Sequence, residues 1–179
     1  MTMQRDPEST VDVIFDALRW LAMPVCVVGS GVGTARSCAT GTLSYVSLDP
    51  PMIATPLGLG SRTYDLAHRA GAFSISLLRD DQDLIAVQAA RAAISEDKFN
   101  DLSIAVQTWN DVPAMADCGS VLWCSIEEEY AVHDHVICVG RIRAASRGEA
   151  LGVPLLRHQA RYYATGELCP AIDDATYPL

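Results

Sequence analysis

The strongest constraint on the fold is a pair of long apolar β segments, residues 119–132 and 135–145, which only His133 and Asp134 separate. A short polar connection of this kind is typical of two antiparallel strands joined by a tight turn. Further strand patterns precede the pair, and strands and helices do not alternate regularly along the chain. This combination predicts a mainly β fold, an antiparallel barrel with peripheral helices.

The other elements are predicted from apolar periodicity and from the residues that interrupt it. Short apolar runs predict strands, whereas apolar residues at steps of three and four predict one face of a helix. Small and hydroxyl residues indicate further strands within residues 35–47. The expected strands cover residues 25–30, 51–57 and 72–78, with a short one within 152–164; the expected helices run from Ser9 or Thr10 to before Pro24, over 63–69, and from Asp81 through 84–94.

The length of the chain and the lack of a linker-like stretch predict one domain. The chain has 179 residues, which suits a single core better than two. Residues 98–116 look irregular, and no stretch has the composition of an interdomain linker. We therefore expect one domain over residues 1–179, with a core of about residues 10–165, a loose N-terminal arm and a loose C-terminal tail.

The charge balance excludes several classes of partner. The net charge is −9 and the isoelectric point is near 4.7, which argues against nucleic acid and against an anionic membrane surface. Any bound phosphate must therefore be held by local donors. No apolar run approaches the roughly 20 residues of a membrane-spanning helix, and the first ten residues do not resemble a secretory signal. We expect a soluble, cytoplasmic protein.

Cysteine and histidine spacing gives no sign of a metal site. None of the six cysteines forms a C-x-x-C pair, and several lie inside apolar runs, as buried small hydrophobic residues do. His133 and His135 share one face of a strand, but no third ligand is evident. We therefore predict no metal.

The glycine-rich stretch at residues 29–33 superficially resembles a dinucleotide-binding motif. That motif needs a third glycine where this chain has Thr34, and a helix must open there to face the pyrophosphate. The residues after Thr34 carry no helical apolar face. A glycine-rich hairpin turn is the better interpretation, so a nicotinamide cofactor would bind without a Rossmann domain.

Two other segments have the composition of a ligand site. Residues 37–51, SCATGTLSYVSLDPP, repeat small residues and hydroxyls along an extended segment, so one face can offer hydroxyls and backbone N–H groups. Residues 56–63, PLGLGSRT, end a strand just before a helix. They provide two hydroxyls, a guanidinium and the N–H groups of a helix start, which together can hold a phosphate.

With these motifs the sequence resembles the flavin reductase-like family, the FMN-binding split β-barrels. The resemblance also includes the strand PVCVV, the strand GAFSISLL, Asp97-Lys98-Phe99, and the segment DHVICVG that begins at Asp134. It covers most of the chain and rests on the shared order and spacing of these motifs. The fold it implies is a split barrel, and the cofactor it implies is FMN, with FAD as the alternative.

The resemblance also assigns roles to individual residues. Thr40, Gly41 and Thr42 would contact the flavin, next to Ala39 in the same run. Phosphate binding would fall to Ser61, Arg62 and Thr63. The remaining assignments place Pro56, Leu57 and Gly58 along the ring or ribityl chain, Lys98 and Phe99 near the flavin, and His135 at the nicotinamide as the candidate catalytic residue.

The implied activity is reduction of FMN or FAD by NADH or NADPH in a homodimer, with delivery of reduced flavin to a separate monooxygenase. Two alternatives remain open at this point. One is a flavin-binding split barrel with a different redox task or a direct organic substrate. The other is a β-barrel that binds a partner and carries no cofactor, in which Thr40 and Thr42 are simply strand residues.

Overall fold

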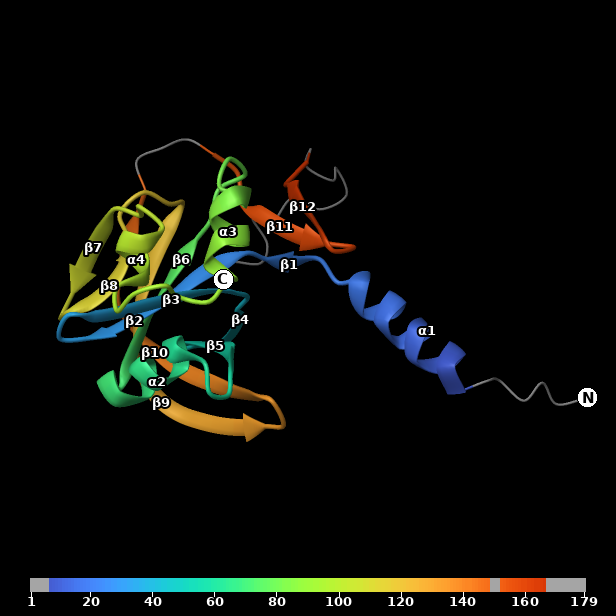
Figure 1. Cartoon of the computed structure of the whole chain (residues 1–179), viewed down its shortest axis with the longest axis horizontal. Helices are drawn as coiled ribbons and strands as arrows, with labels where there is room; N and C mark the ends of the chain where they lie inside the picture. Colours follow the sequence, from blue (N-terminus) through green and yellow to red (C-terminus); the bar gives the residue numbers. More distant parts are fainter. Residues whose placement is uncertain (1–6, 149–151, 167–179) are drawn as a thin grey trace, which may run out of the picture.

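The computed structural model describes residues 7–148 and 152–166. The expected arm and tail lie mostly outside these ranges. Within them the chain is mainly β, with four helices at the periphery (Figure 1). The elements are α1 (Pro7–Arg19), β1 (Met23–Pro24), β2 (Cys26–Val32), β3 (Ala35–Gly41), β4 (Ser44–Leu48), β5 (Pro51–Gly58), α2 (Arg62–Ala70), β6 (Ala72–Leu77), α3 (Asp83–Ala89), α4 (Lys98–Asp101), β7 (Val106–Trp109), β8 (Val112–Met115), β9 (Ser120–Val132), β10 (His135–Arg147), β11 (Leu155–His158) and β12 (Arg161–Ala164).

A seven-stranded antiparallel sheet forms the body of the molecule, in the order β3-β2-β6-β9-β10-β5-β4. Its two edge strands, β3 and β4, are consecutive in the chain and are joined only by Thr42 and Leu43. Such a link spans at most about 11 Å, so the sheet must curl until its edges meet. Because no ladder pairs β3 with β4, the barrel stays split at this seam.

The predicted long hairpin is confirmed. β9 and β10 pair along almost their whole length, from Val132 opposite His135 to Ser120 opposite Arg147. His133 adopts a left-handed φ of 51° in the tight turn. At Gly140 of β10 an added Cβ would lie 2.5 Å from Phe73 Cζ, so the hairpin can pack on β6 only because that position has no side chain.

The glycine-rich stretch forms a hairpin turn, as the sequence predicts. Val32 pairs with Ala35, leaving Gly33 and Thr34 as the two turn residues, and Gly33 has a φ of 60°. Strand β2, which enters this turn, is buried on both faces. Cys26 and Val28 belong to the core inside the barrel, whereas Val27 belongs to a second core under α3, α4 and β8.

Several boundary predictions are wrong. Helix α1 begins at Pro7, before the expected caps Ser9 and Thr10. Helix α3 begins after Gln82, because Asp81 pairs with Arg79 instead of capping the helix, and it already ends at Ala89. The region 98–116, expected to be irregular, contains α4 and the β7–β8 hairpin; the segment 152–164 contains the hairpin of β11 and β12, which β1 extends to a three-stranded sheet.

The apolar face predicted for the first helix is present, but nothing in the described part of the chain covers it. Helix α1 extends away from the barrel (Figure 1). The side chains of Val11, Ile14, Phe15 and Leu18 are each more than half exposed. Among the helices of the described residues, α1 included, none is long and apolar enough to cross a membrane.

Candidate flavin site

The two segments that the sequence singles out lie side by side in the structure. They form the walls of a hollow of about 460 Å³, which we call the β3–α2 hollow. One wall is strand β3 and another is the start of α2. The hollow is lined by Ser37, Cys38, Ala39, Ser61, Arg62, Thr63, residues 89–93 and Lys98.

A buried hydroxyl pair joins the two walls. Ser37 Oγ and Thr63 Oγ1 are 3.0 Å apart, and both residues are almost fully buried. A hydroxyl pair uses one hydrogen for its shared bond, so the second hydroxyl still has a hydrogen to donate. Ser37 is absent from the predicted site, although it lies two positions before Ala39 and therefore on the same face of the strand.

Helix α2 presents its N-terminus to the hollow. Ser61 caps this nine-residue helix: its Oγ accepts a hydrogen bond from the amide of Tyr64 at 3.2 Å. The first amides of a helix have no carbonyl partner within it. The helix dipole adds partial positive charge at the same place, so the Ser61–Thr63 turn is suited to an anion.

Arg62 is fixed above the hollow by backbone carbonyls. Its guanidinium donates to Ser95 O at 3.1 Å and to Glu96 O at 2.8 Å. These bonds use two of the five N–H donors of a guanidinium, which leaves three for a ligand. Because the acceptors are neutral carbonyls, the charge of Arg62 is not cancelled by them.

Lys98 closes the hollow from the core side. Its Nζ donates to Cys38 O at 2.7 Å, to Ala89 O at 2.7 Å and to Arg91 O at 2.5 Å. The residue is only 4% exposed, and burial lowers the pKa of its ammonium. The hollow is thus lined by two cationic side chains whose hydrogen-bond acceptors are carbonyls. Arg62 thereby keeps local donors that are suited to an anion, although the chain as a whole is acidic.

The run Ala39–Thr42 reaches the hollow only in part. Ala39 lines it, but the hydroxyl of Thr40 donates to Ala86 O in α3 and so points elsewhere. Gly41 and Thr42 lie at the seam of the barrel, where Thr42 O accepts a hydrogen bond from Thr55 Oγ1 at 2.8 Å. The sequence therefore located the strand, whereas the alternation of its side chains decides which members face the hollow.

Two predicted site residues have their side chains in the core. Leu57 is 3% exposed and packs inside the barrel, and Phe99 is fully buried in the second core. On β5 the side chains alternate between faces, so Leu57 points inward while Pro56 is exposed and Gly58 half-buried. The side chains of Leu57 and Phe99 therefore do not line the hollow, and their assignment to the flavin stays a prediction.

His135 lies near this end of the barrel but outside the hollow. It pairs with Gly58 across β10 and β5, and Gly58 O accepts a hydrogen bond from the Ser61 amide at 3.0 Å. Its side chain is about half exposed, and its Nδ1 lies 2.9 Å from Asp134 Oδ1. His135 is thus paired with Gly58, which is hydrogen-bonded to the Ser61 turn, and the imidazole ring of His135 stays accessible.

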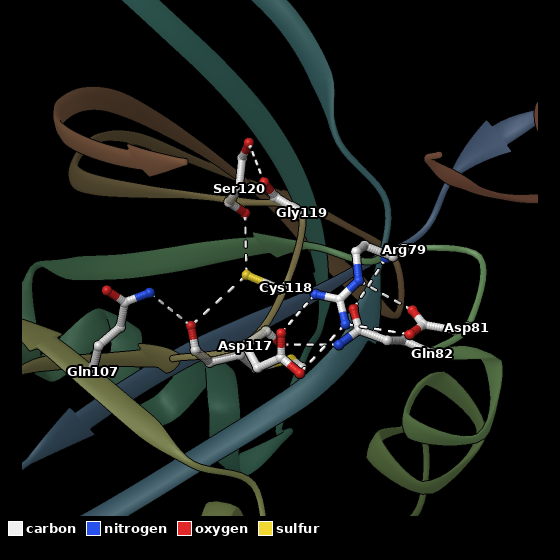
Figure 2. A network of polar contacts seen from close by, with 9 residues as sticks. Arg79, Asp81, Gln82, Gln107, Asp117, Cys118, Gly119 and Ser120 are labelled. Atoms are coloured by element: carbon white, nitrogen blue, oxygen red, sulfur yellow. Dashed lines mark hydrogen bonds and ion pairs between the residues drawn. The ribbon is translucent and has the colours of Figure 1, made fainter. Parts of the chain in front are cut away.

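A second cluster surrounds Arg79, whose partners are carboxylates and not carbonyls. The Arg79 side chain is 8% exposed and donates to Asp81 Oδ1 at 3.1 Å and to Asp117 Oδ1 at 2.6 Å (Figure 2). Gln82 completes the cluster by donating to Asp117 O at 2.9 Å. In residues 7–148 and 152–166, no group of three or more His, Cys, Asp or Glu side chains is placed to hold a metal ion.

Comparison with known proteins decides the family. Residues 18–166 match the model of the flavin reductase like domain. The chain belongs to this family.

Relatives of this flavin reductase-like protein include an FMN reductase and the reductase component of a monooxygenase. It is 30% identical to an NADH-dependent FMN reductase of Streptomyces nodosus subsp. asukaensis, over 81% of this chain and 78% of that protein. It is also 30% identical to the reductase component of 4-hydroxyphenylacetate 3-monooxygenase of Thermus thermophilus, over 82% of this chain and 91% of that protein.

Solved structures confirm the fold. The NADH:FAD oxidoreductase of Streptomyces globisporus C-1027 superposes with a TM-score of 0.79 at 22% identity, covering 93% of this chain and 99% of that one. The flavin reductase of styrene monooxygenase from Pseudomonas putida S12 superposes with a TM-score of 0.76 at 22% identity, covering 87% and 99%. The predicted mainly β split barrel is therefore confirmed.

Proposed function

We propose that the β3–α2 hollow binds the phosphate end of FMN and that the chain, an NAD(P)H:flavin oxidoreductase, reduces this flavin. The observation that carries the proposal is the donor set of the hollow. It combines the hydroxyls of Ser37 and Thr63, the helix start at Ser61 and the free N–H groups of Arg62. Every one of these groups can donate to a phosphate.

The chain's own residues bind and orient; the bound flavin supplies the hydride acceptor. Ala39 and Gly41 of the edge strand β3, with Thr42 after it, offer their backbone to the isoalloxazine; Pro56 and Gly58 belong to β5, whose Thr55 donates to Thr42 O. Ser61, Arg62 and Thr63 hold the phosphate. No acid–base residue is required for hydride transfer, so positioning and exclusion of water are the tasks left to the protein.

We assign His135 to the nicotinamide, because its ring is exposed beside the strand end that leads into the Ser61 turn. We expect His135→Ala to lower turnover with NADH more than it lowers flavin affinity. His133→Ala, on the same turn, is the matched control. Steady-state kinetics at saturating FMN, together with FMN titration, separates the two effects; turnover equal to that of the parent would remove His135 from the site.

We propose that the functional unit is a homodimer. Strand β4 is a sheet edge with exposed apolar side chains: Tyr45, Val46 and Leu48 are 59%, 51% and 54% exposed. An unpaired edge with apolar side chains favours association. Sedimentation of the parent should give a dimer, and Val46→Asp should give monomers; a monomeric parent at micromolar concentration contradicts the proposal.

We further propose that the dimer acts in the cytoplasm and supplies reduced flavin to a separate monooxygenase. The decisive experiment is an absorbance spectrum of the purified protein, followed by anaerobic titration with NADH and NADPH and assays with added FMN or FAD. Turnover that depends on added flavin supports a diffusible flavin substrate. A flavin-bound protein that is inert to NADH and NADPH supports a different redox task, and a colourless protein whose Tm ignores FMN supports a cofactor-free barrel.

A further inference from the structure

Lys98 is the only lysine in the chain, and its position is unusual. It is 4% exposed, and no carboxylate within the described residues lies within ion-pair distance of its Nζ. Burying an ammonium without a countercharge is costly unless its donors are all satisfied. Here three backbone carbonyls satisfy all three donors.

The three acceptors lie on two separate parts of the wall of the hollow. Cys38 O belongs to strand β3, whereas Ala89 O and Arg91 O end helix α3 and begin the segment of residues 90–97. We call this stretch the 90–97 segment. One ammonium therefore ties the beginning of the 90–97 segment to the strand that carries Ala39.

The far end of the 90–97 segment is fixed by charged groups as well. Asp101 accepts hydrogen bonds from the amides of Ile94 and Ser95, at 3.0 Å and 2.8 Å, and from Ser95 Oγ at 2.6 Å. The carbonyls of Ser95 and Glu96 in turn accept from the Arg62 guanidinium. The backbone of the segment thus connects the carbonyl of Arg91, which Lys98 binds, to the carbonyls that Arg62 binds, and the amide of Arg36 also donates to Glu96 O at 2.9 Å.

From this arrangement we infer that Lys98 is a positioning residue: it fixes the 90–97 segment, whose carbonyls orient Arg62 toward the phosphate. The inference deepens the proposed function and rests on it for the identity of the ligand. Lys98 does not contact the phosphate itself, because an ammonium has three donors and all three are bound to carbonyls.

A double-mutant cycle separates this role from direct binding. We expect Lys98→Met to weaken FMN binding roughly tenfold in the parent but less than about threefold in the Arg62→Ala background, because residues that act through one another are coupled. Riboflavin, which has no phosphate, should lose much less affinity in both cases. Additive losses in the cycle would overturn the inference.

A second readout uses the unmodified protein, so it does not depend on the variant folding. With ¹⁵N-lysine labelling, the chain gives one Nζ signal. We expect this signal to move little when FMN is added; direct coordination of the phosphate would shift it strongly and would overturn the inference. Lys98→Arg, which keeps a cation and donors, should restore part of the affinity that Lys98→Met loses.

Hydrogen exchange tests the same role without any ligand. In Lys98→Met the amides of residues 90–97 should exchange faster than in the parent, while those of β9 and β10 should not change. Equal exchange in the 90–97 segment would contradict a positioning role. If the parent binds no FMN at all, the proposed function fails, yet this measurement still decides whether Lys98 holds the segment.

Discussion

Two buried or half-buried cation clusters in this protein differ in what satisfies them. Around Arg79, the guanidinium makes four hydrogen bonds to the carboxylates of Asp81 and Asp117 (Figure 2). Around the β3–α2 hollow, Arg62 and Lys98 donate to backbone carbonyls. A carboxylate cancels the charge of its partner, whereas a carbonyl satisfies donors and leaves the charge in place.

The difference changes what each cluster can offer to an anion. The Arg79 cluster is closed: Arg79, Gln82 and Asp117 hold the end of β6, the start of α3 and the β8–β9 connection together. In the hollow, neither Arg62 nor Lys98 has a carboxylate of the described residues within ion-pair distance, although Asp101 acts on both at longer range. Composition alone gives no sign of this arrangement, because it depends on which acceptor each cation meets.

The largest expected effect concerns the open cluster. Arg62→Ala should weaken FMN binding by about 1–3 kcal/mol, since it removes charge-assisted hydrogen bonds to the phosphate. Riboflavin affinity should stay the same. Fluorescence titration of both flavins measures this, with Arg69→Ala, on the same helix, as the control; unchanged FMN affinity would take Arg62 out of the site.

A substitution in the Arg79 cluster should change the stability of the protein and not its flavin affinity. Arg79→Met should lower the free energy of unfolding by about 1–2 kcal/mol, because it removes hydrogen bonds to carboxylates that remain solvated. FMN affinity should not change. Urea unfolding and flavin titration of the same variant check both halves; a loss of flavin affinity without a loss of stability would show that the two clusters are not separate.

A smaller effect is expected from pH. The hydrogen bond from Arg79 lowers the pKa of Asp117 below its ordinary value of 3.8. A lowered folded-state pKa contributes stability above that ordinary value, and the contribution is lost as pH falls through the lowered pKa. Asp117→Asn should therefore reduce Tm slightly at pH 7 and not at pH 2–3. A constant Tm difference across this range would contradict the assignment.

The smallest expected effect is in thiol reactivity, where the two regions should not differ. Burial raises the pKa of Cys38, beside the hollow, to about 11, and that of Cys118, in the Arg79 cluster, to about 11. Thiols react as thiolates, so neither should react with an alkylating agent at pH 8 in the folded protein. Mass mapping after timed alkylation tests this; rapid labelling of Cys38 alone would mean that Lys98 activates it.

Local patterns predict the parts of this fold that depend on neighbours in the sequence. The hairpin of β9 and β10, the glycine turn at Gly33 and the helix after Ser61 each follow from a few adjacent residues. The region 98–116 is missed because α4, β7 and β8 are only four residues long each. Short elements carry too little periodicity to be recognised, and tertiary contacts stabilise them.

For the candidate site, too, the sequence predicts some features and only the tertiary structure decides others. By itself the sequence determined the family, the barrel and the two segments, 37–51 and 56–63, that supply the hydroxyls and Arg62. Only the tertiary structure decided that Ser37 meets Thr63, that Leu57 and Phe99 belong to the core, and that Lys98 and Arg62 bind carbonyls. The physical reason is that the direction of a side chain and the identity of its partner depend on residues far away in the chain. A list of residue types records neither.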